Sequence, residues 1–228
     1  MLNRAARFFP ILRELKSNLP VGGSLLEVGS GAIGLGEFWE VPFVGCDVAF
    51  SARPLGNMRA VQCSGHQLPF ADGAFDGVVV SDVMEHVLPE QRKQVLIEVL
   101  RVARTVAVFA NPCGPAAFEL DHRLYGEYKS RSLPPPVWLE EHMLHAFPDE
   151  ELFSDLPTGW NRRVLPNEAL QFHYWMMRAE MLRPFNESFR LALKIAPSLV
   201  ERFLGLMNRE PSYRKIFVLT RESHPVYA

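Results

Sequence analysis

Cysteine is scarce in this sequence, and this scarcity limits the disulfides and metal sites that the protein can have. The 228 residues include three cysteines, Cys46, Cys63 and Cys113, and no CxxC pair. An odd number of cysteines at wide spacing indicates neither a disulfide framework nor a cysteine zinc site. We therefore expect a reducing, cytoplasmic compartment and no bound metal.

Long apolar runs and an excess of charge of one sign are also lacking. No window approaches the roughly 18 consecutive apolar residues of a membrane-spanning helix, and Pro10, Arg13 and Glu14 interrupt the apolar start of the chain too early for a signal peptide. We expect a soluble protein with no membrane span and at most weak peripheral association. The formal net charge of -2 supplies no overall field that would gather nucleic acid, so no such partner is expected.

What is present is an ordinary globular composition, with 48% hydrophobic and 22% charged residues. The length suits one α/β domain over residues 1–228. Apolar residues at helical spacing, among them Phe8, Leu12 and Leu15, predict an amphipathic lead-in helix within 1–20.

Strand-like apolar runs alternate with helical or turn material over 21–110, the half of the chain in which a cofactor site is expected. The predicted strands are 24–28, 41–46, 61–63, 77–81 and 105–110, with a crossover helix over 90–104. The run VVV at 78–80 is typical of a central strand buried on both faces. This alternation predicts an open, doubly wound, mostly parallel sheet with helices on both faces and a ligand crevice at the carboxyl ends of the strands.

The second half is less regular. Residues 111–148 are rich in proline, aromatics and histidine, and we interpret them as an insertion that forms a lid or acceptor pocket, with inert padding as the alternative. Residues 149–228 predict a short helix at 149–156, a strand at 161–165, one or two helices within 168–207 broken at Pro184 and Pro197, and a closing strand over 212–221. Aromatic residues and methionines gather at 172–177, where core packing is favoured over an apolar substrate channel.

The strongest local pattern is SLLEVGSGAIGLG at 24–36, a strand that runs into closely spaced glycines. Glycine lets the backbone turn sharply and approach a ligand closely. The strand FVGCD follows and ends in Asp47, where a carboxylate can accept hydrogen bonds from a ribose diol, or can simply cap a turn. The spacing of Gly29, Gly31 and Gly34 also fits a dinucleotide fingerprint, so an NAD(P)-dependent oxidoreductase stays open on these two motifs.

A third motif, LPFADGAFDGVVVSDVMEHV at 68–87, separates the alternatives. With the glycine turn and Asp47 it makes the first half of the chain resemble the class I S-adenosylmethionine-dependent methyltransferases, in the branch with LPF, FD and an acidic-His pair. That resemblance implies a seven-stranded Rossmann-like sheet with an antiparallel final strand. It also implies S-adenosyl-L-methionine as cofactor and S-adenosylhomocysteine as product.

The resemblance also implies roles for individual residues. Glu27 corresponds to the acid that orients the glycine loop, the loop passes the methionine part, Asp47 holds the ribose, and Val48 lies beside the adenine. The implied cofactor-binding residues are Glu27, Gly29, Ser30, Gly31, Gly34, Asp47, Val48, Ser64, Gly65, His66, Ser81 and Asp82. Ile33 stands where the family usually has its third glycine, and Ser64 replaces a common aspartate, so a non-catalytic cofactor-binding relative is the alternative.

His86 is the first candidate for a catalytic base, because its ordinary pKa of about 6.5 suits proton acceptance at neutral pH. Glu85 either orients it or acts itself, and the alternative is that both residues merely begin the helix after the loop. The acceptor is expected to be a small molecule or a lipid-linked or glycan group. A second group of histidines, His122, His142 and His145, lacks a metal-ligand frame and is interpreted as solvated or substrate-facing.

Overall fold

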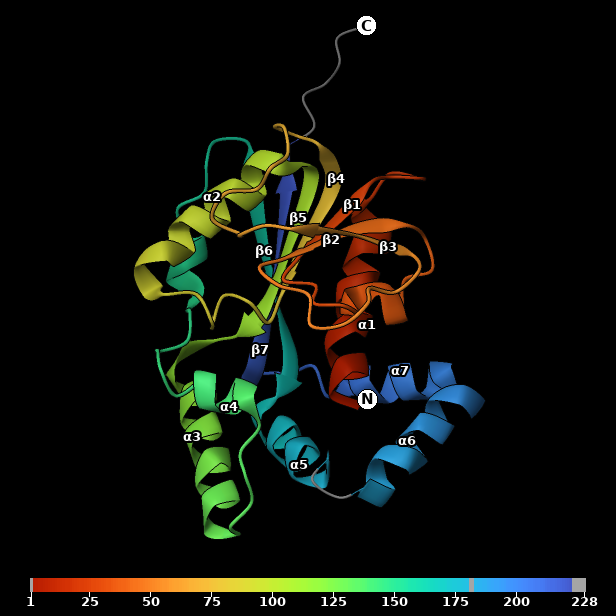
Figure 1. The fold of residues 1–228 in the computed structure, drawn as a ribbon, viewed down its shortest axis with the longest axis vertical. Coiled ribbons are helices and arrows are strands. Elements are labelled where there is room, and N and C mark those ends of the chain that lie inside the picture. The colour runs from red at the N-terminus through yellow and green to blue at the C-terminus, as the bar shows by residue number, and fades with distance from the viewer. Residues whose placement is uncertain (1, 181–182, 223–228) are drawn as a thin grey trace, which may run out of the picture.

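The computed structural model describes residues 2–180 and 183–222, and its centre is one seven-stranded sheet in the order β3-β2-β1-β4-β5-β7-β6 (Figure 1). β7 runs antiparallel to both β5 and β6, and the remaining pairs are parallel. The strands are β1 Leu25–Val28, β2 Phe43–Asp47, β3 Met58–Gln62, β4 Phe75–Ser81, β5 Ala103–Pro112, β6 Trp160–Ala169 and β7 Ser212–Arg221. The predicted sheet, with its antiparallel final strand, is confirmed.

Each predicted strand overlaps an observed one, and the largest displacement is at the sheet edge. β3 covers Met58–Gln62, whereas the sequence predicted 61–63. Only Met58 of this strand is buried, because β3 has a neighbour on one side alone. An edge strand carries little apolar pattern, so its position is hard to read from sequence.

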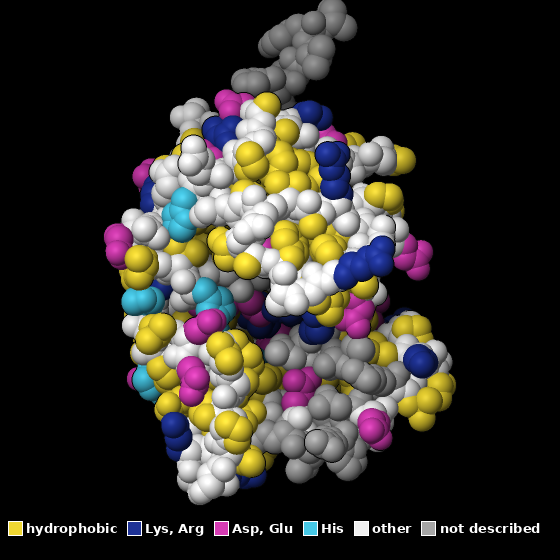
Figure 2. All heavy atoms as spheres, viewed as in Figure 1, with side chains coloured by type: hydrophobic (Ala, Val, Ile, Leu, Met, Phe, Trp, Pro, Cys, Tyr) yellow, Lys and Arg dark blue, Asp and Glu magenta, His cyan; other side chains and the backbone are white. Residues whose placement is uncertain are grey.

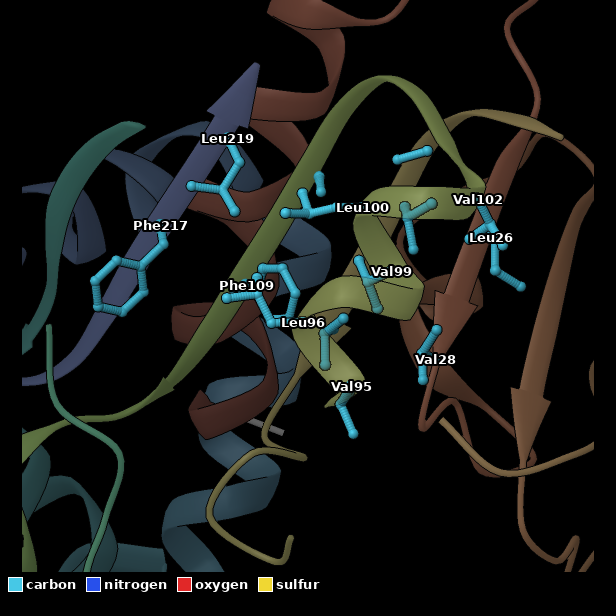
Figure 3. Packing of buried hydrophobic residues seen from close by; sticks show 14 of the residues in the cluster. Leu26, Val28, Val95, Leu96, Val99, Leu100, Val102, Phe109, Phe217 and Leu219 are labelled. Atoms are coloured by element: carbon cyan, nitrogen blue, oxygen red, sulfur yellow. The ribbon is translucent and has the colours of Figure 1, made fainter. Parts of the chain in front are cut away.

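Two layers of side chains alternate along the central strands. Val78 and Val80 belong to one buried cluster, while Val79 belongs to the cluster on the opposite face. The first cluster packs against helix α2 (Arg92–Val102), as Figure 3 shows for the leucines and valines of that helix. The second packs against helix α1 (Leu2–Asn18). Helices therefore cover both faces, as predicted, and 78–80 is buried on both sides.

Short 3₁₀ turns replace longer helices at several connections. They are η1 Gly34–Glu37, η2 Pro89–Gln91 and η3 Glu150–Phe153. The connections from β1 to β4 contain no α-helix, and all of their residues are described. The predicted helix at 149–156 is thus the single turn η3.

The remaining helices form a helical cap, defined as α3 to α7, which lies below the sheet in Figure 1. Its members are α3 Gly114–Ser130, α4 Val137–Glu141, α5 Leu170–Glu180, α6 Arg183–Ile195 and α7 Pro197–Leu206. The described residues of 168–207 form three helices rather than one or two, and Pro184 and Pro197 lie in the first turns of α6 and α7, where proline is tolerated. The parts of the expected segments that fall on residues 1, 181–182 and 223–228 lie outside the described residues.

Helix α1 joins the cap to the sheet. Phe8 and Ile11 pack on the sheet, whereas Leu2 and Ala5 belong to the buried cluster of the cap. That cap cluster also takes Met176 and Met177 of the aromatic and methionine-rich segment, which confirms core packing for them. No helix in the described ranges is both long and apolar enough to cross a membrane.

The packing of α2 gives a stability prediction. Leu96 is buried under the sheet and its neighbour Ile97 is exposed. We expect Leu96→Ala to lower the free energy of unfolding by about 2–5 kcal/mol, because it leaves a cavity in the core. Ile97→Ala, on the same helix, should cost less than about 1 kcal/mol. Urea unfolding of both variants measures the difference, and equal losses would contradict the assigned packing.

Candidate functional site

A cavity of about 510 Å³ opens at the carboxyl ends of β1, β2 and β4, and we call it the strand-end cavity. The face shown in Figure 2 is hollowed at mid-height, with histidine and charged side chains at the hollow. The residues singled out from the sequence that line this cavity are Gly29, Asp47, Val48, Ser64, Gly65, His66, Asp82 and His86. Glu27, Ser30, Gly31, Gly34 and Ser81 do not line it.

The glycine loop is held close to β2 and to the turn after β4. Gly29 has a φ of 76°, and a Cβ at this position would overlap the side chain of Val83. The Gly29 and Ser30 amides both donate to the Cys46 carbonyl, at 2.8 and 3.1 Å. Only glycine fits at 29, which explains the first glycine of the pattern.

Glu27 holds the glycine loop in shape without lining the strand-end cavity. Its Oε2 accepts a hydrogen bond from the Leu35 amide at 2.8 Å. Gly34 has a φ of 50°, and a Cβ there would overlap the Glu27 carboxylate. Burial raises the pKa of Glu27 to about 7, against the lowering effect of the Leu35 hydrogen bond.

Asp47 closes the other side of the loop. Its Oδ2 accepts from the Gly31 amide at 2.8 Å, and Oδ1 lies 3.4 Å from the Ala49 amide. The carboxylate thus caps the glycine turn while it lines the strand-end cavity. The capping and ligand-binding interpretations of Asp47 are compatible.

Ser64, Gly65 and His66, the third predicted group, line this cavity as well. Ser64 Oγ is 2.8 Å from His66 Nδ1, which fixes the orientation of the ring. His66 Nε2 is buried and has no hydrogen-bond partner among the described residues. An unpaired buried nitrogen beside a cavity is a position at which a polar ligand atom can bind.

A second cavity of about 330 Å³, which we call the cap pocket, lies between the sheet and the helical cap. It shares Asp82 and His86 with the strand-end cavity. The residues that line it are Asn3, Arg4, Arg7, Asp82, Glu85, His86, Pro112, Trp138, His142, His173, Tyr213 and Arg214. Glu85 and His86 lie in a turn that precedes η2, so the alternative in which they merely begin a helix is wrong.

Buried ion pairs fix Asp82 at the boundary between the two cavities. Arg214 binds both of its carboxylate oxygens, through Nε at 2.7 Å and Nη2 at 3.0 Å, and Arg7 binds Oδ2. Arg214 also pairs with Glu168, which holds His173. Burial alone would raise the pKa of Asp82, but the two guanidinium groups hold it well below its usual range.

A second chain of polar contacts runs along the cap. The Tyr213 hydroxyl donates to Asp121 Oδ2 at 2.8 Å, and the same oxygen lies 2.6 Å from His142 Nδ1. His142 Nε2 is 3.9 Å from Glu85 Oε1. Burial, and then the charge of Asp82, raise the pKa of Glu85 well above its ordinary value.

Comparison with known proteins agrees with this arrangement. Residues 26–110 match the family model for a methyltransferase domain. Over this stretch, which runs from β1 into β5, the chain is similar to methyltransferase domains. No curated protein matches the sequence.

Three solved structures share the fold at low identity. A chain of the Haloferax volcanii complex between the Trm112 methyltransferase activator and a methyltransferase is 12% identical, with a TM-score of 0.53 over 96% of this chain and 90% of that one. The methyltransferase domain of bacterial CtHen1-CN is 15% identical, with a TM-score of 0.51 over 96% and 100%. Phosphoethanolamine N-methyltransferase 2 of Haemonchus contortus, bound to phosphomonomethylethanolamine and S-adenosylhomocysteine, is 15% identical, with a TM-score of 0.51 over 92% and 52%.

Sequence reasoning missed the charged residues that other segments bring to Asp82 and to its partner Arg214. Arg7 comes from α1, Glu168 from β6 and Arg214 from β7. The one visible signal was Arg214, which precedes the apolar run 216–219 of the predicted strand 212–221. His122 packs on the Phe118 ring and lines neither cavity, so the structure separates it from His142.

The raised pKa of Glu27 predicts a pH-dependent stability. The folded state keeps this proton up to about pH 7, while the unfolded chain releases it near 4.5. The free energy of unfolding therefore falls as pH rises between these values, by roughly 3 kcal/mol from this group. Glu27→Gln should remove that fall, which denaturant unfolding at a series of pH values measures. Glu90→Gln, at an exposed carboxylate, is the control and should keep the wild-type slope.

Asp82 gives a second prediction. Asp82→Asn leaves the buried Arg214 with Glu168 as its one remaining charged partner among the described residues and removes the partner of Arg7, so we expect a loss of about 3 kcal/mol or more in the free energy of unfolding. Asparagine suits the left-handed backbone at this position, where φ is 49°, so the loss reports on charge. Asp72→Asn removes an exposed pair with Arg101 and should cost less than about 1 kcal/mol. Losses of similar size in the two variants would contradict the role of Asp82.

Proposed function

We propose that the protein binds S-adenosylmethionine in the strand-end cavity and transfers the methyl group to a small polar acceptor in the cap pocket. One observation carries the proposal: Asp82 and His86 line both cavities. A donor in one cavity and an acceptor in the other would therefore meet beside these two side chains.

The residues of the strand-end cavity fit such a cofactor. Gly29 brings the backbone close to the cavity where no side chain fits. Asp47 offers carboxylate oxygens for a ribose diol, and the unpartnered His66 Nε2 offers a polar contact for a base edge. When bound, the cofactor supplies an electrophilic methyl group on a positively charged sulfur.

The protein's own contribution is position and exclusion of water. Methyl transfer is an in-line displacement, so a rigid boundary between donor and acceptor can supply several kcal/mol of the barrier. The ion pairs of Asp82 with Arg7 and Arg214 make that boundary rigid. Burial, and then the neighbouring His142, lower the pKa of His86, so its imidazole is neutral at pH 7 and can accept a proton from an acceptor hydroxyl.

The cap pocket favours a small polar acceptor over a lipid-linked one. Histidine, arginine and tyrosine side chains surround it, and Trp138 supplies an aromatic wall. The apolar segment at 172–177 does not form a channel to it, since Tyr174, Met176 and Met177 line neither cavity. Segment 111–148 contributes Pro112, Trp138 and His142, which supports its role as part of the acceptor pocket.

Calorimetric titration with S-adenosylhomocysteine tests the proposal, with NAD and NADP as parallel ligands. We expect S-adenosylhomocysteine alone to bind. Asp47→Ala should weaken it by about 10- to 100-fold, because a charged hydrogen bond is lost. Asp47→Asn keeps an acceptor for the Gly31 amide, so it separates the effect of losing the charge from the effect of changing the loop. Asp155→Ala, at an exposed site, should bind as wild type does.

Each outcome decides between the candidate functions. Binding of a nicotinamide nucleotide alone would replace the methyltransferase proposal with an oxidoreductase one. Binding of S-adenosylhomocysteine with no turnover in a broad acceptor screen would indicate a cofactor-binding relative without catalysis.

A further inference from the structure

Three potential ligand side chains gather where the two cavities meet. Glu85, His86 and His142 each offer one ligand atom, and these atoms all lie within 4.8 Å of one another. Glu85 and His86 come from the turn after β4, and His142 directly follows α4 in the cap. Within the described ranges, no other set of three histidine, cysteine, aspartate or glutamate residues has this arrangement.

Glu85 is the member of this cluster whose carboxylate lacks a hydrogen-bond partner among the described residues. It is 1% exposed and lines the cap pocket. Neither of its carboxylate oxygens accepts a hydrogen bond from any residue that the structure describes. Buried carboxylates are ordinarily paired with a cation or bound to a metal, since an isolated buried charge is very costly. Among the described residues the one ion-pair contact of this group is the long one to His142, at 3.9 Å, so both of its oxygens are available to a cation in the cap pocket.

Both histidines are oriented by a further carboxylate. His142 Nδ1 lies 2.6 Å from Asp121 Oδ2, and His86 Nδ1 lies 3.1 Å from Glu141 Oε2. Metal-binding histidines almost always donate their second ring N–H to such a group, which fixes the tautomer. In both rings this arrangement leaves the Nε2 lone pair for a ligand.

We propose that Glu85, His86 and His142 bind a divalent transition-metal ion. Two imidazoles and one carboxylate suit Zn²⁺, Co²⁺, Fe²⁺ or Mn²⁺, whereas Mg²⁺ prefers oxygen ligands. Tetrahedral ligands at about 2.1 Å from the ion lie about 3.4 Å from one another, so the three side chains close in by about 1 Å on binding. The half-buried His86 side chain can turn toward the other two, which are rigidly packed.

The ion has a use in the reaction, and this part of the inference rests on the proposed function. Three protein ligands leave a coordination position open beside His86, at the boundary of the two cavities. A hydroxyl oxygen of the acceptor that binds there has a lowered pKa and gives its proton to water. The oxygen then forms the new bond to the methyl carbon, and the sulfur–carbon bond breaks with its electron pair left on sulfur. A histidine whose lone pair binds the ion cannot also accept a proton, so in the metal-bound protein the ion replaces His86 as the group that promotes loss of the acceptor proton, and His86 keeps its proposed role as base only without the ion.

Metal titration of chelator-treated protein tests the site. We expect one Co²⁺ per chain by visible absorption and one Zn²⁺ by calorimetry, with Mg²⁺ at least tenfold weaker. Glu85→Gln and His142→Ala should each weaken Co²⁺ binding at least tenfold. Asp121→Asn should weaken it by about 10- to 100-fold through the orientation of His142. His145→Ala, three residues along the same segment and outside the cluster, is the matched control and should bind as wild type does.

Parallel titration with S-adenosylhomocysteine shows that each variant is folded and separates the two proposals. Wild-type protein that binds S-adenosylhomocysteine but no Co²⁺ or Zn²⁺ would overturn the metal site and leave the proposed function standing. Metal binding without S-adenosylhomocysteine binding would overturn the proposed function and leave the metal site standing. Unchanged Co²⁺ affinity in both Glu85→Gln and His142→Ala would place any bound ion elsewhere and overturn this site.

Discussion

The buried guanidinium of Arg214 is the contact on which the rest of the site depends. It joins the end of β4 through Asp82, the end of β6 through Glu168 and the start of β7 through its own backbone. Asp82 and Glu168 both have left-handed backbones, with φ of 49° and 58°. Each such conformation costs about 1–3 kcal/mol and persists only where the surroundings enforce it. Here the ion pairs with Arg214 enforce it, because an unpaired charge at this depth would cost more free energy than the backbone strain.

The same contact ties the two cavities to the N-terminal helix. Arg7 reaches Asp82 from α1, and Arg4 donates to the Gly34 carbonyl at 2.8 Å. One helix therefore contacts the glycine loop, the boundary residue and the cap cluster. Because α1 also packs on the sheet face opposite α2, the strand-end cavity and the cap pocket keep a fixed relative position.

The parts of this protein that sequence predicts are those that local pattern determines. The buried strands follow from uninterrupted apolar runs such as 78–80, and the loop follows from Gly29, Gly34 and the acid at 47. The cap pocket could not be predicted in the same way. Asp121 meets Tyr213, and Glu168 meets Arg214, although each pair is far apart along the chain, and both contacts need β7 in its place in the sheet. In the sequence Asp121, Glu168 and Arg214 stand out only as charged residues. Sequence alone does not show which charged positions the fold buries. Glu85 and His86 were found from a motif, but His142 joins them through the cap.

The place of β7 in the sheet also has a consequence for how the chain folds. β7 follows the other six strands of this sheet along the chain, yet it lies between β5 and β6 rather than at an edge. Until β7 is in place, β6 has no neighbour in the sheet, and α1, which precedes all seven strands, lacks part of the surface that it covers. Contacts between the two ends of a chain slow folding, because a long loop must close before they form. The strand-end cavity is lined by residues that precede β6 and β7, whereas the cap pocket, which Tyr213 and Arg214 line, is incomplete until β7 has joined the sheet.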